Sequence, residues 1–96
     1  PRSHAGSLLD PRLAGAVFAE LPERLRQGGV RGVQVESVER GSRAAANGLR
    51  QGDLVVATTG GRVDDLAAFR ASLPGTDVRL LLQIVRGDAA GTLTMQ

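Results

Sequence analysis

The chain contains no cysteine, no lysine, no tryptophan and no tyrosine, and its only aromatic residues are Phe18 and Phe69. Without cysteine there is no disulfide, no thiolate metal ligand and no cysteine nucleophile, and nothing in cysteine usage indicates a redox compartment. With only two aromatic rings, the core has to be built from valine, leucine, isoleucine and alanine side chains. The sequence therefore predicts a modest aliphatic core.

Long apolar stretches are also missing. No run reaches the ~18–20 residues that a helix needs to cross a bilayer, and the first residues lack the pattern of a secretion signal. We therefore expect no membrane insertion. A length of 96 residues with 42% hydrophobic content fits one domain. We expect that domain to cover residues 8–96, and residues 1–7 to be a disordered terminus or a remnant foreign to the domain.

The charge is nearly balanced. The net charge is +2, and the pI of about 11.0 is high because every basic side chain other than the single histidine is an arginine. Arginine alternates with aspartate and glutamate along the chain, whereas nucleic-acid binding calls for a basic face, with aromatic residues for stacking on single strands. We therefore predict no nucleic-acid partner.

The usual catalytic residue sets are absent from the sequence. The only histidine, His4, falls in the predicted terminus, so a triad built on a histidine base is not expected. No Cys/His cluster suits zinc, and no glycine-lysine-serine/threonine ending marks a phosphate loop. The adjacent Asp64 and Asp65 are interpreted as helix caps. The sequence predicts neither an active site nor a cofactor.

The element pattern is mainly β. Strands are predicted at 13–18, 32–38, 54–58, 78–85 and 91–96, from apolar alternation or short apolar runs bounded by glycine, proline and aspartate. A loop with one helical turn is predicted at 20–29, a short helix capped by Ser42, and a longer helix over 66–73. This order predicts an α+β fold, mainly β: a small, partly open β-barrel or sandwich capped by one short and one longer helix.

The middle of the chain resembles the PDZ pattern: a capped mini-helix, its glycine stop, a glycine-aspartate turn, a strand and a helix at fixed separations. The residues that carry this resemblance are Gly41-Ser42, Ala44-Ala45, Gly48-Leu49, Gly52-Asp53-Leu54-Val55-Val56, Val63 and Leu66. The flanking segments 8–16 and 82–87, with Leu93 and Met95, are similar to the second, C-terminal PDZ domain of DegP and DegQ proteases of the HtrA family.

The resemblance implies a circularly permuted bacterial PDZ fold. It also implies that the chain is a non-catalytic module of a serine endoprotease that degrades misfolded proteins in the periplasm or cell envelope of a Gram-negative bacterium. The implied partners are unfolded or C-terminal protein segments, and other PDZ or protease domains of the same homo-oligomer. The alternatives are a pure assembly domain without peptide binding, or a PDZ domain of another bacterial protease or secretion protein.

The implied binding site follows from strand addition, in which a peptide pairs with an exposed sheet edge beside a helix. Carried onto this sequence, the site has three parts: a loop at 10–13, an open edge strand at 13–18, and a helix wall at 66–73. Its residues are Asp10, Pro11, Arg12, Leu13, Ala14, Gly15, Ala16, Val17, Phe18, Leu66, Phe69, Arg70 and Leu73.

One loop residue departs from the family pattern. PDZ domains that hold a terminal carboxylate well have a glycine in the loop, which lets successive amides converge on the carboxylate. Arg12 stands at the matching position. Its charge attracts a carboxylate, but its side chain removes the glycine geometry, and this departure favours docking between subunits over capture of a free C-terminus.

Overall fold

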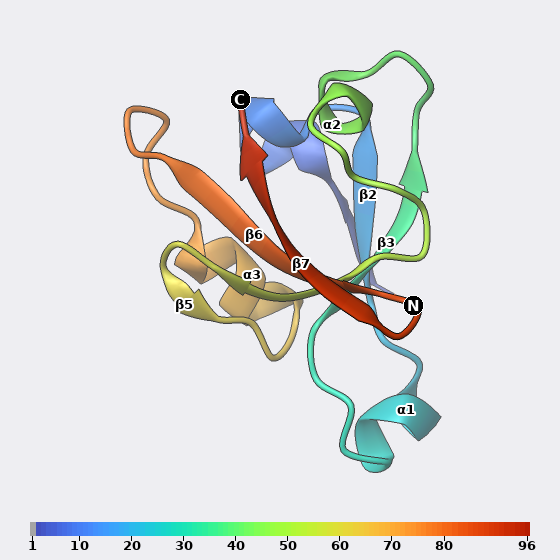
Figure 1. The fold of residues 1–96 in the computed structure, drawn as a ribbon. Helices are drawn as coiled ribbons and strands as arrows, with labels where there is room; N and C mark the ends of the chain where they lie inside the picture. Colours follow the sequence, from blue (N-terminus) through green and yellow to red (C-terminus); the bar gives the residue numbers. More distant parts are fainter. Residues whose placement is uncertain (1) are drawn as a thin grey trace.

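The computed structural model describes residues 2–96, and within them the chain forms one open antiparallel sheet with short helices around it (Figure 1). The strands run in the order β1-β2-β3-β4-β6-β7, and β5 pairs with β4 outside this path. The strands are β1 (Ser3–Ala5), β2 (Ala16–Glu20), β3 (Val33–Val38), β4 (Leu54–Thr58), β5 (Gly61–Arg62), β6 (Leu80–Arg86) and β7 (Ala89–Met95). The α-helices are α1 (Glu23–Gln27), α2 (Arg43–Ala46) and α3 (Leu66–Ser72), and the 3-10 helices are η1 (Gly6–Leu8) and η2 (Pro11–Leu13).

The predicted β-rich fold is confirmed, and so are the local signals behind it. Ser42 accepts a hydrogen bond from the Ala45 amide at 3.1 Å and so begins α2. Asp65 does the same for α3 through the Ala68 amide at 2.8 Å. Helices α1 and α2 lie at opposite ends of the sheet (Figure 1).

The predicted strand at 13–18 is wrong at its start. Leu13 belongs to η2, and the strand begins only at Ala16. Asp10 accepts a hydrogen bond from the Arg12 amide at 2.9 Å, and Pro11 has the backbone φ that suits the first position of a helical turn. These two residues favour a 3-10 turn where the apolar pattern alone favoured extended chain.

The prediction of a disordered terminus is wrong for the described residues ahead of Leu8, and Pro1 lies outside those residues. Ser3–Ala5 form β1, which pairs antiparallel with β2, and η1 follows directly. The ordering comes from tertiary contact: Gly6 is buried, and a Cβ there would collide with the Leu13 carbonyl oxygen. Such a short strand gains its order from the sheet it joins.

The core lies between the sheet and the helices α2 and α3. Its two aromatic rings, Phe18 from β2 and Phe69 from α3, are fully buried and stand 4.8 Å apart at a tilt of 51°. Around them pack aliphatic side chains, as predicted: Leu13, Val33, Val35, Leu49, Val55, Val63, Leu66, Leu80, Leu82 and Ile84. This packing fixes α3 against β2.

Among residues 2–96, no helix is long and apolar enough to cross a membrane. Within the same residues, no group of three or more His, Cys, Asp or Glu side chains is placed to hold a metal ion.

Candidate functional site

The candidate site lies where β2 faces α3, and two contacts set the distance between them. Phe18 and Phe69 pack ring against ring beneath the site. At the end of β2, Glu20 Oε1 accepts a hydrogen bond from the Leu66 amide at 3.0 Å, so a strand carboxylate satisfies an amide at the start of α3. Within the predicted strand 13–18, Phe18 is thus the residue that contacts the helix carrying Phe69.

The predicted helix wall divides into buried and accessible residues. Leu66 and Phe69 belong to the core, whereas Leu73 is half-buried and Arg70 is exposed. An incoming chain therefore has Arg70 on α3 and Leu73, directly after the helix, to contact. Leu66 and Phe69 support the site from beneath.

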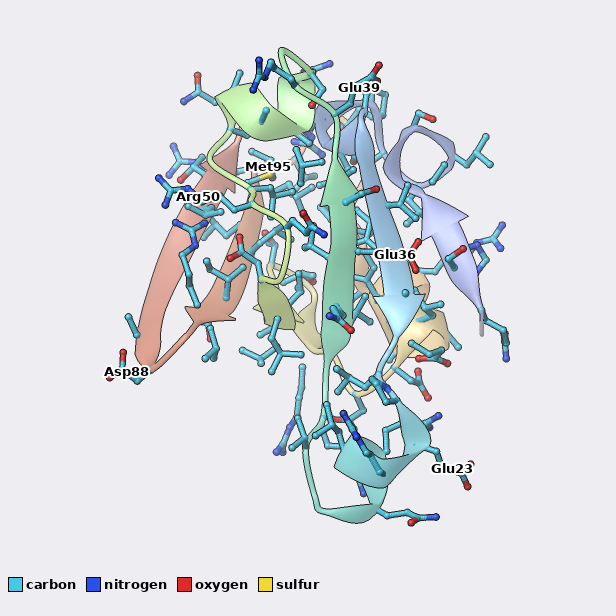
Figure 2. The ribbon with its side chains drawn as sticks, turned by 90° about the vertical axis from the view of Figure 1, so that its right-hand side faces the viewer. Glu23, Glu36, Glu39, Arg50, Asp88 and Met95 are labelled. Atoms are coloured by element: carbon cyan, nitrogen blue, oxygen red, sulfur yellow. The ribbon has the colours of Figure 1, made fainter. Side chains whose placement is uncertain are left out.

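The expectation of an open edge is wrong, because β1 covers the outer edge of β2. Ser3 pairs with Ala19, His4 with Phe18 and Ala5 with Val17, and the Glu20 amide donates to the Arg2 carbonyl at 3.0 Å. Figure 2 shows β1 as the faint violet arrow beside the blue β2, with α3 behind the sheet. In the chain itself, β2 lies between β1 and β3.

The Arg12 side chain is paired within the chain and is not free to bind the carboxylate of a ligand. Its residue is only 7% exposed. Its guanidinium donates to both Asp10 carboxylate oxygens, from Nε at 3.0 Å and from Nη2 at 2.9 Å, and also to the Val78 carbonyl at 2.7 Å and the Gly75 carbonyl at 3.3 Å. The side chain therefore ties the loop before β2 to the loop after α3.

The amides of the same loop are also engaged. The Arg12 amide donates to the Asp10 carboxylate, the Leu13 amide to the Asp10 carbonyl at 2.9 Å, and the Ala14 amide to the Pro11 carbonyl at 3.2 Å. A backbone cradle for an anion needs such amides free and convergent. Loop 10–14 instead uses these three for its own fold.

Gly15 and Ala16 lie at the junction between the loop and β2. Gly15 has φ of +96°, and a Cβ there would collide with the Ser42 side chain at the start of α2. Any larger residue at this position would displace Ser42. The role of Gly15 is to seat the loop against α2 before Ala16 starts the strand.

The two buried carboxylates have depressed pKa values. The hydrogen bond from the Arg12 side chain lowers the pKa of Asp10 more than its burial raises it. Burial also acts to raise the pKa of Asp53, but hydrogen bonds from the Arg86 side chain and the Arg50 amide outweigh it, so that pKa is lowered as well. The Asp53–Arg86 pair joins the turn before β4 to the end of β6, and its role is structural.

These shifts predict acid sensitivity. In the folded state both carboxylates bind protons less readily than in the unfolded chain, whose aspartates have a pKa of about 3.9. The stabilisation they contribute is complete above about pH 5 and is lost as the pH falls through 4 toward the folded-state values, at about 1.4 kcal/mol per unit of pKa difference. Urea unfolding between pH 6 and pH 3 measures the decline. Asp10→Asn and Asp53→Asn should each flatten it, and a level profile in the original chain would contradict the assignment.

Sequence reasoning missed two parts of the site. One is β1, whose three residues are too few for a periodic signal; the one hint was Gly6, a possible site of close backbone approach. The other is Glu20, which was assigned to a loop and lies at the end of β2, where it caps α3. Its contact joins positions 46 residues apart, which no local pattern reveals.

No model of a known protein family matches the chain. It is 32% identical over 94 residues to the periplasmic pH-dependent serine endoprotease DegQ of Escherichia coli, which covers 98% of this chain and 20% of DegQ. It is 37% identical over 87 residues to a probable periplasmic DegP-like endoprotease of Chlamydia pneumoniae, and 36% identical over 74 residues to the periplasmic endoprotease DegP of Salmonella typhimurium. These matches cover 88% and 77% of this chain, and 17% and 16% of the relatives. The chain thus spans about a fifth or less of each relative's length.

The fold also has a close counterpart among solved structures. A crystal structure of the HtrA3 PDZ domain bound to a phage-derived ligand, FGRWV, superposes with a TM-score of 0.68 at 22% sequence identity. The superposition covers 84% of this chain and 79% of that one. The PDZ fold predicted from the sequence is confirmed.

Proposed function

Since the chain belongs to the HtrA family of DegP- and DegQ-like serine endoproteases and has the PDZ fold, we propose that it is a non-catalytic module that binds extended protein segments for such a protease. The proposed setting is the periplasm of a bacterium, since the relatives are periplasmic enzymes, and the proposed task is protein quality control. Its place as the second PDZ domain of the protease stays a prediction from the sequence.

One observation carries this proposal: the outer edge of β2 accepts a strand. The pairing of Ser3–Ala5 along β2 is an instance of strand addition in the chain's own structure. Beside this edge, α3 carries the exposed Arg70, the half-buried Leu73 follows the helix, and the Phe18 and Phe69 rings pack between β2 and α3. The ligand-bound HtrA3 PDZ domain supports peptide partners for a domain of this fold.

The proposed ligand is an internal extended segment, which has no need of a free carboxylate. Arg12 is bonded to Asp10 and to two carbonyls, and the amides of Arg12, Leu13 and Ala14 are bonded within their loop. Main-chain pairing with β2 then supplies the affinity, and contacts with α3 supply the selectivity. Segments of unfolded proteins meet this description.

Titration of the isotopically labelled 96-residue chain with the peptide Phe-Gly-Arg-Trp-Val tests the proposal. We expect amide shifts in Ala16–Glu20 and in Leu66–Ser72, with millimolar affinity, and the same affinity within about twofold for the C-terminally amidated peptide, since the amides of Arg12, Leu13 and Ala14 are engaged within their own loop. Absence of shifts in β2 at millimolar peptide would refute peptide binding. A loss of more than tenfold on amidation would refute the preference for internal segments.

The second candidate is docking between subunits of the parent protease, and the burial of Arg12 favours it. A strand of a neighbouring subunit has no free end to offer, and a site without a carboxylate cradle suits it. Deleting the domain from the parent protease and measuring particle mass tests this candidate. Particles of unchanged size would exclude it.

A further inference from the structure

We propose that the segment 2–5 is a resident occupant of the candidate site, which an external segment has to displace before it pairs with β2. This inference rests on the proposed function, because it concerns access to the same edge. It is carried by the position, direction and attachment of β1.

The position of β1 is the one strand addition prescribes for a ligand. The strand lies outside β2, antiparallel to it, at the end of the sheet order. An external strand pairing with β2 would need the same edge groups, among them the Glu20 amide that now donates to the Arg2 carbonyl. Both strands cannot use one edge at the same time.

One side chain of the segment points into the site. His4 stands opposite Phe18, and directly opposed residues of an antiparallel pair share a face of the sheet. Phe18 contacts Phe69 of α3, so that shared face is the one α3 covers. His4 is accordingly half-buried, whereas its neighbours Ser3 and Ala5 are exposed.

The other end of the segment is held at Glu20. The Arg2 end of the segment lies at Glu20, whose amide donates to the Arg2 carbonyl at 3.0 Å. Glu20 and Glu23 also line a hollow of about 510 Å³ with Glu36, which alternates with the buried Val35 and so lies on the face of the sheet away from α3. The labelled Glu23 and Glu36 mark this region in Figure 2. The bond between the Glu20 amide and the Arg2 carbonyl extends the pairing of the segment by one residue beyond Ser3.

The segment is attached close to the site but held by few contacts. At its C-terminal side the Gly6 carbonyl accepts hydrogen bonds from the Leu9 and Asp10 amides, both at 2.9 Å, and Gly6 packs on the Leu13 backbone without room for a Cβ. This hinge holds β1 near β2 and gives it a high effective concentration. The pairing itself spans three residues, two of them exposed, so β1 can leave without unfolding the core.

Because β1 occupies the edge, the apparent affinity for an external segment equals the intrinsic affinity multiplied by the fraction of molecules in which the edge is open. The test is a pair of substitutions that add the same charge on opposite faces of β1. His4→Asp places a carboxylate beside the Phe18 ring and should release the strand. Ser3→Asp points to solvent and should leave it paired.

The probe is the peptide Phe-Gly-Arg-Trp-Val, titrated against the 96-residue chain, both variants and a chain that starts at Gly6. We expect roughly tenfold tighter binding for His4→Asp and for the shortened chain, as for an open fraction of about a tenth in the original. Ser3→Asp should match the original. Amide spectra of each protein establish that it is folded.

The outcomes separate the two proposals. Equal affinity in all four proteins would overturn the resident occupant and leave peptide binding in place. Absence of binding in all four would overturn peptide binding, and the occupant with it. An increase in the shortened chain alone would still support the occupant and would show that His4→Asp fails to release it.

Discussion

Replacing Arg12 with glycine is expected to lower the free energy of unfolding by about 3–5 kcal/mol. The substitution leaves the Asp10 carboxylate buried without its cation, and the carbonyls of Gly75 and Val78 lose their donor. The free energy of unfolding of a native protein is about 5–15 kcal/mol, so the variant should unfold at a much lower urea concentration. Chemical denaturation at pH 7 measures the change.

The matched control is Arg79→Gly, an exposed arginine close to the carbonyls that Arg12 contacts, expected to cost about 1 kcal/mol or less. Removing Asp10 as well, in the double variant Asp10→Ala with Arg12→Gly, should cost less than the sum of the single changes, because the two side chains act as a pair. If Arg12→Gly were as stable as the original and gained affinity for a free peptide carboxylate, the structural role assigned to Arg12 would be wrong.

Phe69→Ala is the second substitution with a large expected effect. The side chain is fully buried and stacks against Phe18, so its removal leaves a cavity between α3 and β2 and should cost about 3–5 kcal/mol. It should also weaken binding of the Phe-Gly-Arg-Trp-Val peptide, since α3 loses its support beside β2. Urea unfolding and the amide titration measure the two effects.

Its neighbour supplies the control. Arg70 is exposed on the same helix, and Arg70→Ala should change stability by no more than about 0.5 kcal/mol because alanine is a good helix former. That variant tests the surface of the site without disturbing its base. If Phe69→Ala left stability unchanged, the packing of α3 on β2 would not be what fixes the groove.

The local structure could be predicted because its signals are local. Ser42 and Asp65 cap their helices through amides three residues away, and Gly87 in the two-residue turn between β6 and β7 has the positive φ that such a turn requires. Strand 54–58 was predicted at its observed bounds from a short apolar run between turns. In each case the determining contacts lie within a few residues of the chain.

The occupancy of the site could not be predicted, because it depends on contacts between distant or weakly patterned residues. In the sequence Arg12 is a charged loop residue, and besides its pair with Asp10 it is held by carbonyls 63 and 66 positions away, which no local pattern reveals. The segment at Ser3–Ala5 is ordered by pairing with β2, not by its own propensity. The sequence thus predicted the strand from Ala16 and the helix from Leu66, and missed β1 and the burial of Arg12.

Hydrogen exchange of the Glu20 amide tests the central claim, that the outer edge of β2 accepts an extended segment. This amide donates to the Arg2 carbonyl, so its exchange should be slowed in the original chain, faster by up to about tenfold once His4→Asp releases β1, as for an open fraction of about a tenth, and slowed again when the Phe-Gly-Arg-Trp-Val peptide is bound. If the exchange rate of the Glu20 amide changes neither with the substitution nor with the peptide, the claim is contradicted.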